Sequence, residues 1–390
     1  MPNTFIIPPV IVSGEDALRA AGTHFARMGK RALVVADSMM EKLGNVAGVL
    51  ETLTQNGCTG AVFAAVNTEP VDTVVLEGLS TMRREGCDFL VAVGGGSPID
   101  AMKAIAMLHA LGGEPADFFG KTIDQPLPPM AAIPTTAGTG SEATQFTIIT
   151  DTKRDVKMLL KGPSLLPRLA VIDPAFTMTA PPAVTAATGL DALCHCVEAY
   201  TSQKAQPLSD TFALSAAGRI FANLRAAYNN PGDIRAREQM ALAATEAGIA
   251  FNNSSVTLIH GMSRPIGALF HVPHGLSNAM LMEACLEYAA DGARDRFSRL
   301  ARTCGIAASG ADDAEATGLF MKEISSLLRD LAIPTLREFG VDREAFLRAI
   351  PKMAADAMAS GSPGNTRRPI RQEQIKALYR QVMEGGTNAI

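Results

Sequence analysis

The spacing of hydrophobic residues changes at about residue 180 of the chain. Before that point, short apolar runs alternate with stretches in which apolar residues recur with the period of an amphipathic helix. An apolar run without polar alternation is typical of a parallel strand whose two faces are both covered. The runs lie at Arg31–Asp37, Gly60–Val66, Asp88–Val93, Met130–Pro134 and Leu169–Asp173, and the helical stretches between them include Gly44–Asn56, Val71–Glu85 and Ile99–Leu111. This alternation predicts an α/β domain built on a doubly wound parallel sheet.

The second half of the chain has long Ala- and Leu-rich helical patterns and no convincing strand. Examples are Asp210–Ala227, Ala236–Phe251 and Ala314–Leu331. The Pro-containing segment Met178–Pro182 separates the two patterns. We therefore expect an α/β domain over residues 1–181 and an all-helical domain over residues 182–390, with Gly361–Arg371 as a surface loop.

Composition and charge narrow the class of protein. Hydrophobic residues make up 47% of the 390 positions, which is ample for packed cores, and the net charge of −4 argues against nucleic acid or an anionic membrane as main partner. The six cysteines include no CxxC pair, so neither a disulfide framework nor a thiolate zinc site is expected. Glu15 and Asp16 come too early for a signal peptide, and no apolar run reaches the roughly 18 residues of a membrane helix. These features predict a soluble cytoplasmic protein.

Three consecutive glycines follow the apolar run Asp88–Val93. The segment Gly94–Gly96 lets the backbone approach a bulky ligand without Cβ clashes. Ser97 is expected to cap the next helix, with Asp100 completing a capping-box-like spacing. A helix N-terminus that follows the carboxyl end of a strand favours pyrophosphate binding. A tight turn would also fit, but it does not require three glycines, so we expect a phosphate-binding loop.

Two further polar features follow predicted strands. Asp37 could accept hydrogen bonds from ribose hydroxyls and would repel a 2′-phosphate, so it would favour NAD over NADP; taken alone, it fits an ordinary loop carboxylate equally well. The segment Pro134–Glu142 (PTTAGTGSE) offers hydroxyls and bare backbone N–H groups to phosphate or ribose oxygens. The alternative is a solvated Thr-rich loop, but its place after a strand favours ligand binding.

Five side chains that could bind a metal ion occur in two segments of the chain with helical patterns. Asp191 and His195 are four residues apart in Thr188–Tyr200, so a helix presents both on one face. Leu258–Ala279 carries His260, His271 and His274. Any one histidine alone would more simply be a hydrogen-bonded core residue, and His271 could equally face a nicotinamide or solvent. Together, a carboxylate and imidazoles predict a site for Fe²⁺ or Zn²⁺ with a position left for substrate.

These motifs carry a resemblance to a known family. With VGGGSPID, AIPTTAGTGSE, TGLDALCHCVEAY and HGMSRPIGALFHVPHG, the chain resembles the iron-dependent (group III) alcohol dehydrogenases over essentially its whole length. The resemblance implies an N-terminal dinucleotide-binding domain, an all-helical C-terminal domain and a site in the cleft between them. It also implies NAD, a catalytic divalent metal, a small alcohol or aldehyde substrate, and a homodimer or larger homo-oligomer.

The resemblance assigns roles to individual residues. The implied metal ligands are Asp191, His195, His260 and His274. Lys157 matches a lysine that contacts the ribose next to the nicotinamide. The implied cofactor contacts are Asp37, Gly95, Gly96, Ser97, Thr135, Thr136, Thr139 and Lys157. Because no thiolate belongs to the ligand set, Fe²⁺ is expected ahead of Zn²⁺.

The chain departs from the family at Arg264, where HGMAHP commonly has a second histidine assigned to proton relay. Arginine stays protonated, so His271 or water would have to carry the proton. A permanent cation one helical turn from His260 requires a neutralising partner. An acidic neighbour such as Glu142 or Glu246 is one candidate. The other is an anionic group on the substrate, such as the carboxylate of succinate semialdehyde or the sulfonate of sulfoacetaldehyde.

The predicted reaction is therefore hydride transfer between an alcohol or aldehyde and NAD(H), with Arg264 and His271 as candidate catalytic residues. Alternatives within the superfamily are a glycerol-dehydrogenase-like zinc enzyme and a dehydroquinate-synthase-like enzyme. A metallohydrolase is the alternative from another class, but it would have no use for Asp37 and the two glycine-containing loops together. A non-catalytic metal or nucleotide binder leaves the open metal position unexplained.

Overall fold

The structure, a computed structural model, describes residues 2–385 and divides into two compact units. One unit spans Ile6–Ala180, and the other comprises the chain from Pro181 onward with the few residues before Ile6. The sequence division at residues 181 and 182 assigned those first residues to the α/β unit. They join the helical unit because Gln206 donates a hydrogen bond to the carbonyl of Thr4 and Phe5 stacks on Phe212.

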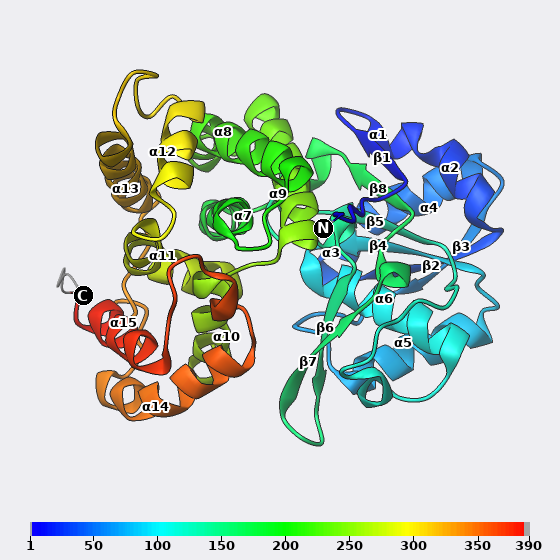
Figure 1. Ribbon diagram of the computed structural model, residues 1–390. Coiled ribbons are helices and arrows are strands. Elements are labelled where there is room, and N and C mark those ends of the chain that lie inside the picture. Colours follow the sequence, from blue (N-terminus) through cyan, green and yellow to red (C-terminus); the bar gives the residue numbers. More distant parts are fainter. Residues whose placement is uncertain (1, 386–390) are drawn as a thin grey trace. The chain divides into compact units, whose positions relative to one another are not determined.

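A parallel sheet of six strands forms the centre of the first unit (Figure 1). Its order is β1-β8-β5-β4-β2-β3. The expected α/β architecture and the five expected strands are confirmed. β1 was not expected, because it is only four residues long and its edge position leaves alternate residues exposed. The strands are β1 (Val10–Ser13), β2 (Arg31–Ala36), β3 (Thr59–Phe63), β4 (Phe89–Gly94), β5 (Met130–Pro134) and β8 (Leu169–Ile172).

Helices cover both faces of the sheet, which is why its inner strands β2, β4, β5 and β8 are buried along almost their whole length. Leu33 and Val35 belong to one core with residues of α5 and α6, whereas Ala32 and Val34 belong to the opposite core with residues of α2 and α4. This division follows the two-residue period of a strand. The helices are α1 (Ala17–Ala20), α2 (Gly22–Met28), α3 (Ser38–Lys42), α4 (Asn45–Gln55), α5 (Asp72–Arg84) and α6 (Gly96–Leu111), and short 3-10 helices span Pro115–Phe118, Ser141–Ala143, Pro163–Leu165 and Pro174–Thr177.

An antiparallel hairpin, β6 (Phe146–Asp151) and β7 (Val156–Lys161), lies outside this sheet. The sequence did not predict these two strands. Their inward positions, such as Ile149, Met158 and Leu160, are buried, while the alternating outward positions are largely polar or exposed. A half-buried hairpin therefore has no continuous apolar run by which to recognise it.

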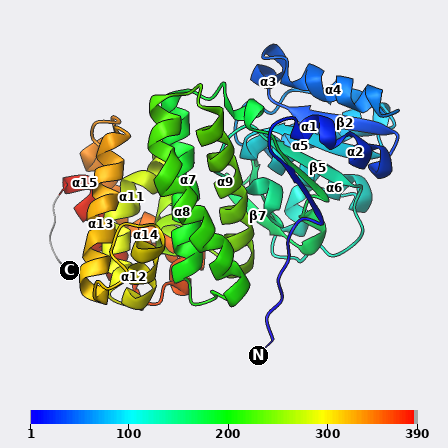
Figure 2. The same cartoon turned by 90° about the horizontal axis from the view of Figure 1, so that it is seen from above.

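The second unit is helical, as expected, and its described residues contain no strand beyond an isolated bridge between Ser202 and Thr366 (Figure 2). Its core lies between long helices, of which α7, α8 and α9 pack closely on one another. The helices are α7 (Pro182–Thr201), α8 (Pro207–Asn229), α9 (Ile234–Ser254), α10 (Leu258–Phe270), α11 (His274–Ala290), α12 (Arg294–Thr303), α13 (Asp313–Asp330), α14 (Arg343–Ala359) and α15 (Gln372–Glu384).

The segment 361–371 is not the simple surface loop that its Gly, Pro and Arg content predicted. It contains a 3-10 helix, Pro363–Asn365, whose proline and asparagine are buried. Asn365 donates a hydrogen bond to the carbonyl of Val256 at 3.0 Å. A Cβ at Gly261 would lie 2.6 Å from the Pro363 ring, so the glycine lets this segment pack against α10. The polar side chain of Asn365 can be buried because Ser255 and Val256, just before α10, accept its hydrogen bonds.

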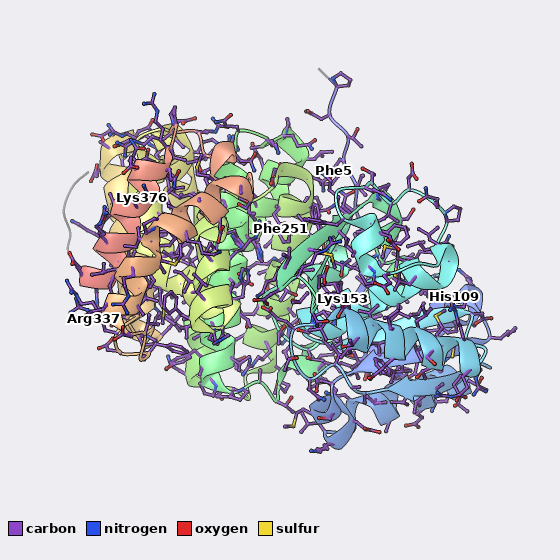
Figure 3. The ribbon with its side chains drawn as sticks, turned by 90° about the horizontal axis from the view of Figure 1, so that it is seen from below. Phe5, His109, Lys153, Phe251, Arg337 and Lys376 are labelled. Carbon is purple, nitrogen blue, oxygen red and sulfur yellow. The ribbon has the colours of Figure 1, made fainter. Side chains whose placement is uncertain are left out.

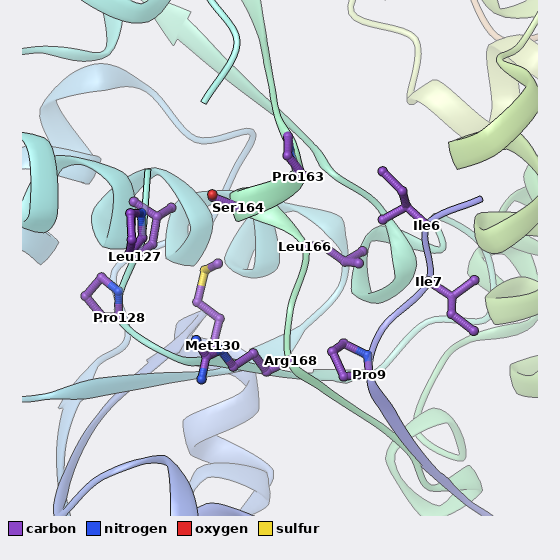
Figure 4. A pocket seen from close by; sticks show the side chains of 11 residues that line it. Ile6, Ile7, Pro9, Leu127, Pro128, Met130, Pro163, Ser164, Leu166 and Arg168 are labelled. Atoms are coloured by element: carbon purple, nitrogen blue, oxygen red, sulfur yellow. The ribbon is translucent and has the colours of Figure 1, made fainter. Parts of the chain in front are cut away.

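None of the described helices is long and apolar enough to cross a membrane. A cavity of about 350 Å³ lies within the α/β unit (Figure 4). Met130 at the start of β5, Arg168 just before β8 and Pro9 just before β1 line it. It therefore lies at the amino ends of the strands, away from the loops proposed to bind the cofactor.

Candidate active site

Three metal-ligating side chains converge inside the helical unit. Asp191 and His195 lie one turn apart on α7, and His260 reaches them from α10. One potential ligand atom from each lies within 4.8 Å of the others, and all three residues are buried. Helical spacing explains why Asp191 and His195 share a face; the addition of His260 depends on how α10 packs on α7.

His274 comes to the same cluster from the first turn of α11. Its Nε2 lies 3.7 Å from Oδ1 of Asp191, while the Oγ of Ser263 lies 3.5 Å from its Nδ1. Its side chain is 42% exposed, in contrast to the other three. A Cβ on the next residue, Gly275, would lie 2.5 Å from the carbonyl oxygen of Ala187. This glycine therefore allows the start of α11 to approach α7.

The cluster is electrostatically coupled. Burial alone would raise the pKa of Asp191, but the neighbouring imidazoles of His195, His274 and His260 hold it well below its usual range. Burial lowers the pKa of His195 to about 3, which keeps its imidazole neutral. Burial also acts to lower the pKa of His260, but the carboxylate of Asp191, 3.6 Å from its Nε2, and that of Glu198, hydrogen-bonded to its Nδ1, raise it to about 9. Two carboxylates thus favour positive charge at His260.

Sequence reasoning missed three residues that surround these ligands. Glu198 accepts a 2.6 Å hydrogen bond from Nδ1 of His260. Asn278 donates to Oδ1 of Asp191 at 2.7 Å. Phe251, on α9 (Figure 3), stacks on the ring of His195 with centroids 4.2 Å apart. Of these, Glu198 had a sequence signal, since it lies three residues after His195 in a largely apolar helix.

The arrangement fits a divalent metal ion. The Nδ1 of His195 is buried without a hydrogen-bond partner among the described residues, as expected of a nitrogen whose natural partner is an ion. One carboxylate and three imidazoles are ligands that suit Fe²⁺ and Zn²⁺, whose bonds to nitrogen and oxygen measure about 2.0–2.2 Å. No cysteine belongs to the cluster.

Arg264 lies on α10, one turn after His260, and is half-buried. Burial lowers its pKa, and the negative charge of Glu198 partly offsets that effect. Within the described part of the helical unit it has no ion-pair partner: Glu246, one of the two expected neighbours, pairs with Arg219 instead.

His271 is the C-cap residue of α10. It has the left-handed backbone conformation, with φ 54°, and its side chain is exposed.

The residues expected to bind the cofactor, apart from Lys157 on β7, follow three adjacent strands of the α/β unit. β2 neighbours β4, and β4 neighbours β5, so Asp37 and the segments 94–97 and 135–139 all follow the carboxyl ends of neighbouring strands. The strand order reverses between β2 and β4, since β3 lies on one side of β2 and β4 on the other. Such a switch point is where open α/β sheets bind ligands.

The helix that follows the glycines, α6, is not capped as the sequence predicted. α6 begins at Gly96 with Gly95 as its N-cap and no capping side chain, so the expected cap by Ser97 and Asp100 is wrong. The helix starts two residues earlier than a cap at Ser97 would require, and Asp100 accepts a hydrogen bond from the backbone N–H of Ile148 instead. The first backbone N–H groups of α6 thus donate no hydrogen bond to a capping side chain.

The glycine loop and the Thr-rich loop form a close-packed pair. A Cβ at Gly95 would lie 3.5 Å from Oγ1 of Thr136, and one at Gly96 would lie 3.1 Å from Cγ2 of Thr139. The Oγ1 of Thr136 is buried without a partner among the described residues. Bare backbone and an unpaired hydroxyl fit the phosphate and ribose oxygens of a dinucleotide.

A buried lysine that the sequence analysis overlooked holds the Thr-rich loop. Lys103, on α6, donates to the carbonyl oxygens of Ser141, Thr144 and Phe146 at 2.8–2.9 Å. Burial lowers its pKa to about 8, against the opposing charges of Asp100 and Glu142. Lys103 therefore ties the end of the loop to the helix that follows the glycines.

Asp37 and Lys157 both have protein partners. Asp37 caps α3 by accepting from the backbone N–H of Met40 at 2.9 Å through Oδ1. Lys157, on β7, forms an ion pair with Glu69. No described residue donates a hydrogen bond to the second carboxylate oxygen of Asp37, so capping and ribose binding are compatible uses of this side chain.

Comparison with known proteins links both units to one family. A family model for iron-containing alcohol dehydrogenase matches residues 8–174, and the model for the C-terminal part of the Fe-containing alcohol dehydrogenase family matches residues 185–383. The 1,3-propanediol dehydrogenase of Klebsiella pneumoniae is 36% identical over 97% of this chain and 98% of its own length.

Solved structures have the same fold. A 1,3-propanediol oxidoreductase superposes with a TM-score of 0.94 at 36% identity, covering 98% of this chain and 100% of that one. A sulfoacetaldehyde reductase from Bifidobacterium kashiwanohense, in complex with NAD⁺, superposes with a TM-score of 0.89 at 26% identity, covering 99% and 100%.

Proposed function

The chain belongs to the iron-containing alcohol dehydrogenase family, and from this premise we propose that it interconverts a short anionic aldehyde and its alcohol. It is an oxidoreductase whose cofactors are NAD and iron. The family match disfavours the metallohydrolase and the non-catalytic binder.

Asp191, His195, His260 and His274 hold the metal ion in this proposal. The meeting of three of these donors within 4.8 Å, with His274 beside them, is the observation that carries the assignment. A bound divalent ion supplies Lewis-acid polarisation of the substrate oxygen. The protein keeps His195 neutral by burial, and hydrogen bonds join Glu198 to His260 and Asn278 to Asp191.

The cofactor contacts are proposed at Asp37, Gly95, Gly96, Ser97, Thr135, Thr136, Thr139 and Lys157. The open N-terminus of α6 and the glycine cradle beside Thr136 support pyrophosphate binding. The place of Asp37 after β2 supports binding of the ribose hydroxyls. NADH then supplies hydride for aldehyde reduction, and NAD⁺ accepts it in the reverse direction.

Arg264 and His271 are proposed to act next to the reacting group. Arg264 keeps its proton, so it binds charge and does not relay protons. His271 can exchange a proton with water because its side chain is exposed. A water molecule is the alternative carrier.

The anionic substrate is proposed from the charge of Arg264. A half-buried guanidinium without an ion pair in its own unit can bind a carboxylate or sulfonate through paired N–H groups. The similarity to a sulfoacetaldehyde reductase supports this class of substrate. We also propose a cytoplasmic homo-oligomer, which the resemblance to the family and the six free cysteines support.

The test is NADH oxidation, followed by absorbance, with the Fe²⁺-loaded and the metal-stripped protein. Sulfoacetaldehyde and succinate semialdehyde are compared with neutral propanal and lactaldehyde and with cationic betaine aldehyde. We expect metal-dependent turnover and a higher kcat/KM for the two anions. A preference for a neutral or cationic aldehyde would refute the substrate class, and turnover by stripped protein would refute the metal's role.

A further inference from the structure

Glu198 contacts a candidate metal ligand without being one. It lies on α7, three residues after His195, and is 1% exposed. Its Oε2 accepts a hydrogen bond from Nδ1 of His260 at 2.6 Å. A carboxylate has no proton to donate, so this contact places the ring proton on Nδ1. The nitrogen left to bind a metal is then Nε2, which lies 3.6 Å from Oδ1 of Asp191.

The other oxygen of Glu198 holds the start of α10. Its Oε1 accepts from Oγ1 of Thr257 at 2.8 Å and from the backbone N–H of Ile259 at 2.5 Å. Thr257 is the N-cap of α10 but makes no capping bond of its own. Glu198 therefore satisfies an N–H group that the helix cannot satisfy, and its charge faces the positive end of the helix dipole. One carboxylate thus holds both the backbone beside His260 and the imidazole itself.

We propose that Glu198 is the positioning residue of the metal site. It holds His260 in the tautomer and the ring rotation that direct Nε2 toward the ion. This inference rests on the proposed function, because it takes His260 to be a metal ligand. Hydrogen-bonded carboxylate partners of metal-binding histidines typically account for about 10–100-fold in metal affinity.

The experiment measures Zn²⁺ affinity of the full-length protein by competition with a chromophoric chelator. Glu198→Gln removes the carboxylate with little change in volume. Glu246→Gln is the matched control, because this half-buried carboxylate bonds to Arg219 and Ser215 and to none of the four candidate ligands. We expect affinity to fall about 10–100-fold in Glu198→Gln and to stay at the wild-type level in Glu246→Gln.

A second readout separates positioning from a general loss of structure. The visible absorption of the Co²⁺-loaded protein reports ligand geometry, and we expect Glu198→Gln to alter these bands while Glu246→Gln leaves them unchanged. Thr257→Val removes a bond to the same carboxylate but leaves the bond to His260. Equal losses of affinity in Thr257→Val and Glu198→Gln would assign the effect to the start of α10 and overturn the inference.

His260→Ala distinguishes the inference from the proposed function. If His260→Ala loses Zn²⁺ affinity but Glu198→Gln keeps wild-type affinity and Co²⁺ bands, the positioning role is overturned and the ligand assignment stands. If His260→Ala itself binds Zn²⁺ as tightly as the wild type, the proposed metal site fails and the role of Glu198 fails with it.

Discussion

Gly275 and Ala187 approach so closely that a side chain at residue 275 would collide with the main chain of α7. A Cβ there would lie 2.5 Å from the Ala187 carbonyl oxygen. His274 is the adjacent residue, and its Nε2 lies 3.7 Å from Oδ1 of Asp191. Close contact between α7 and α11 is therefore a condition for His274 to join the cluster.

Gly275→Ala is expected to displace His274 and to lower kcat/KM on the order of 10²-fold, since a shift of about 1 Å at a reacting centre has that effect. Steady-state kinetics and Zn²⁺ affinity measure the change. Gly218→Ala, on α8, is the matched control because a Cβ there meets nothing within 4 Å. It should keep activity and gain up to about 1 kcal/mol in the free energy of unfolding. Wild-type metal affinity in Gly275→Ala would contradict the assignment of His274.

His260→Ala is expected to abolish turnover while NADH binding stays near the wild-type level. The residues proposed for NADH lie in the unit of Ile6–Ala180, whereas His260 belongs to the helical unit. Activity assays and titration of NADH fluorescence measure the two properties separately. Turnover at the wild-type rate would remove His260 from the metal site.

Asp37→Asn is expected to relax a preference for NADH over NADPH. The substitution keeps an N-cap for α3, because asparagine caps helices as well as aspartate does, but it removes the negative charge. Like charges in contact cost several kcal/mol, so kcat/KM with NADPH should rise by roughly tenfold or more. If the wild type already uses both cofactors with equal efficiency, Asp37 does not contact the ribose.

Arg264→Ala is expected to reduce kcat/KM for anionic aldehydes by about one to two decades, because a charge-assisted contact contributes roughly 1.5–3 kcal/mol. Propanal and lactaldehyde should lose much less. Sulfoacetaldehyde and succinate semialdehyde provide two anions of different geometry. Equal losses for all four aldehydes would make Arg264 a structural residue.

The spacing of hydrophobic residues was sufficient to predict most of the strands and helices. The run MAAIP coincides with β5, and the expected helix Gly44–Asn56 contains α4 (Asn45–Gln55). The hairpin of β6 and β7 was not predicted, because only alternate positions of its strands are buried and no continuous apolar run marks them. Ser97 was expected to cap α6 because its residue type suits a cap, but residue type alone does not determine which residue starts a helix.

The sequence by itself determined that Asp191 and His195 share one face of a helix, because a four-residue spacing is a property of the helix alone. It also placed Asp37 and the two loops after strands. Only the tertiary structure decided that His260 and His274 reach Asp191, that Glu198 holds His260, and that Arg264 has no ion pair within its unit. These contacts join residues far apart in the chain, and they depend on close packing at glycines such as Gly275, which periodicity does not encode.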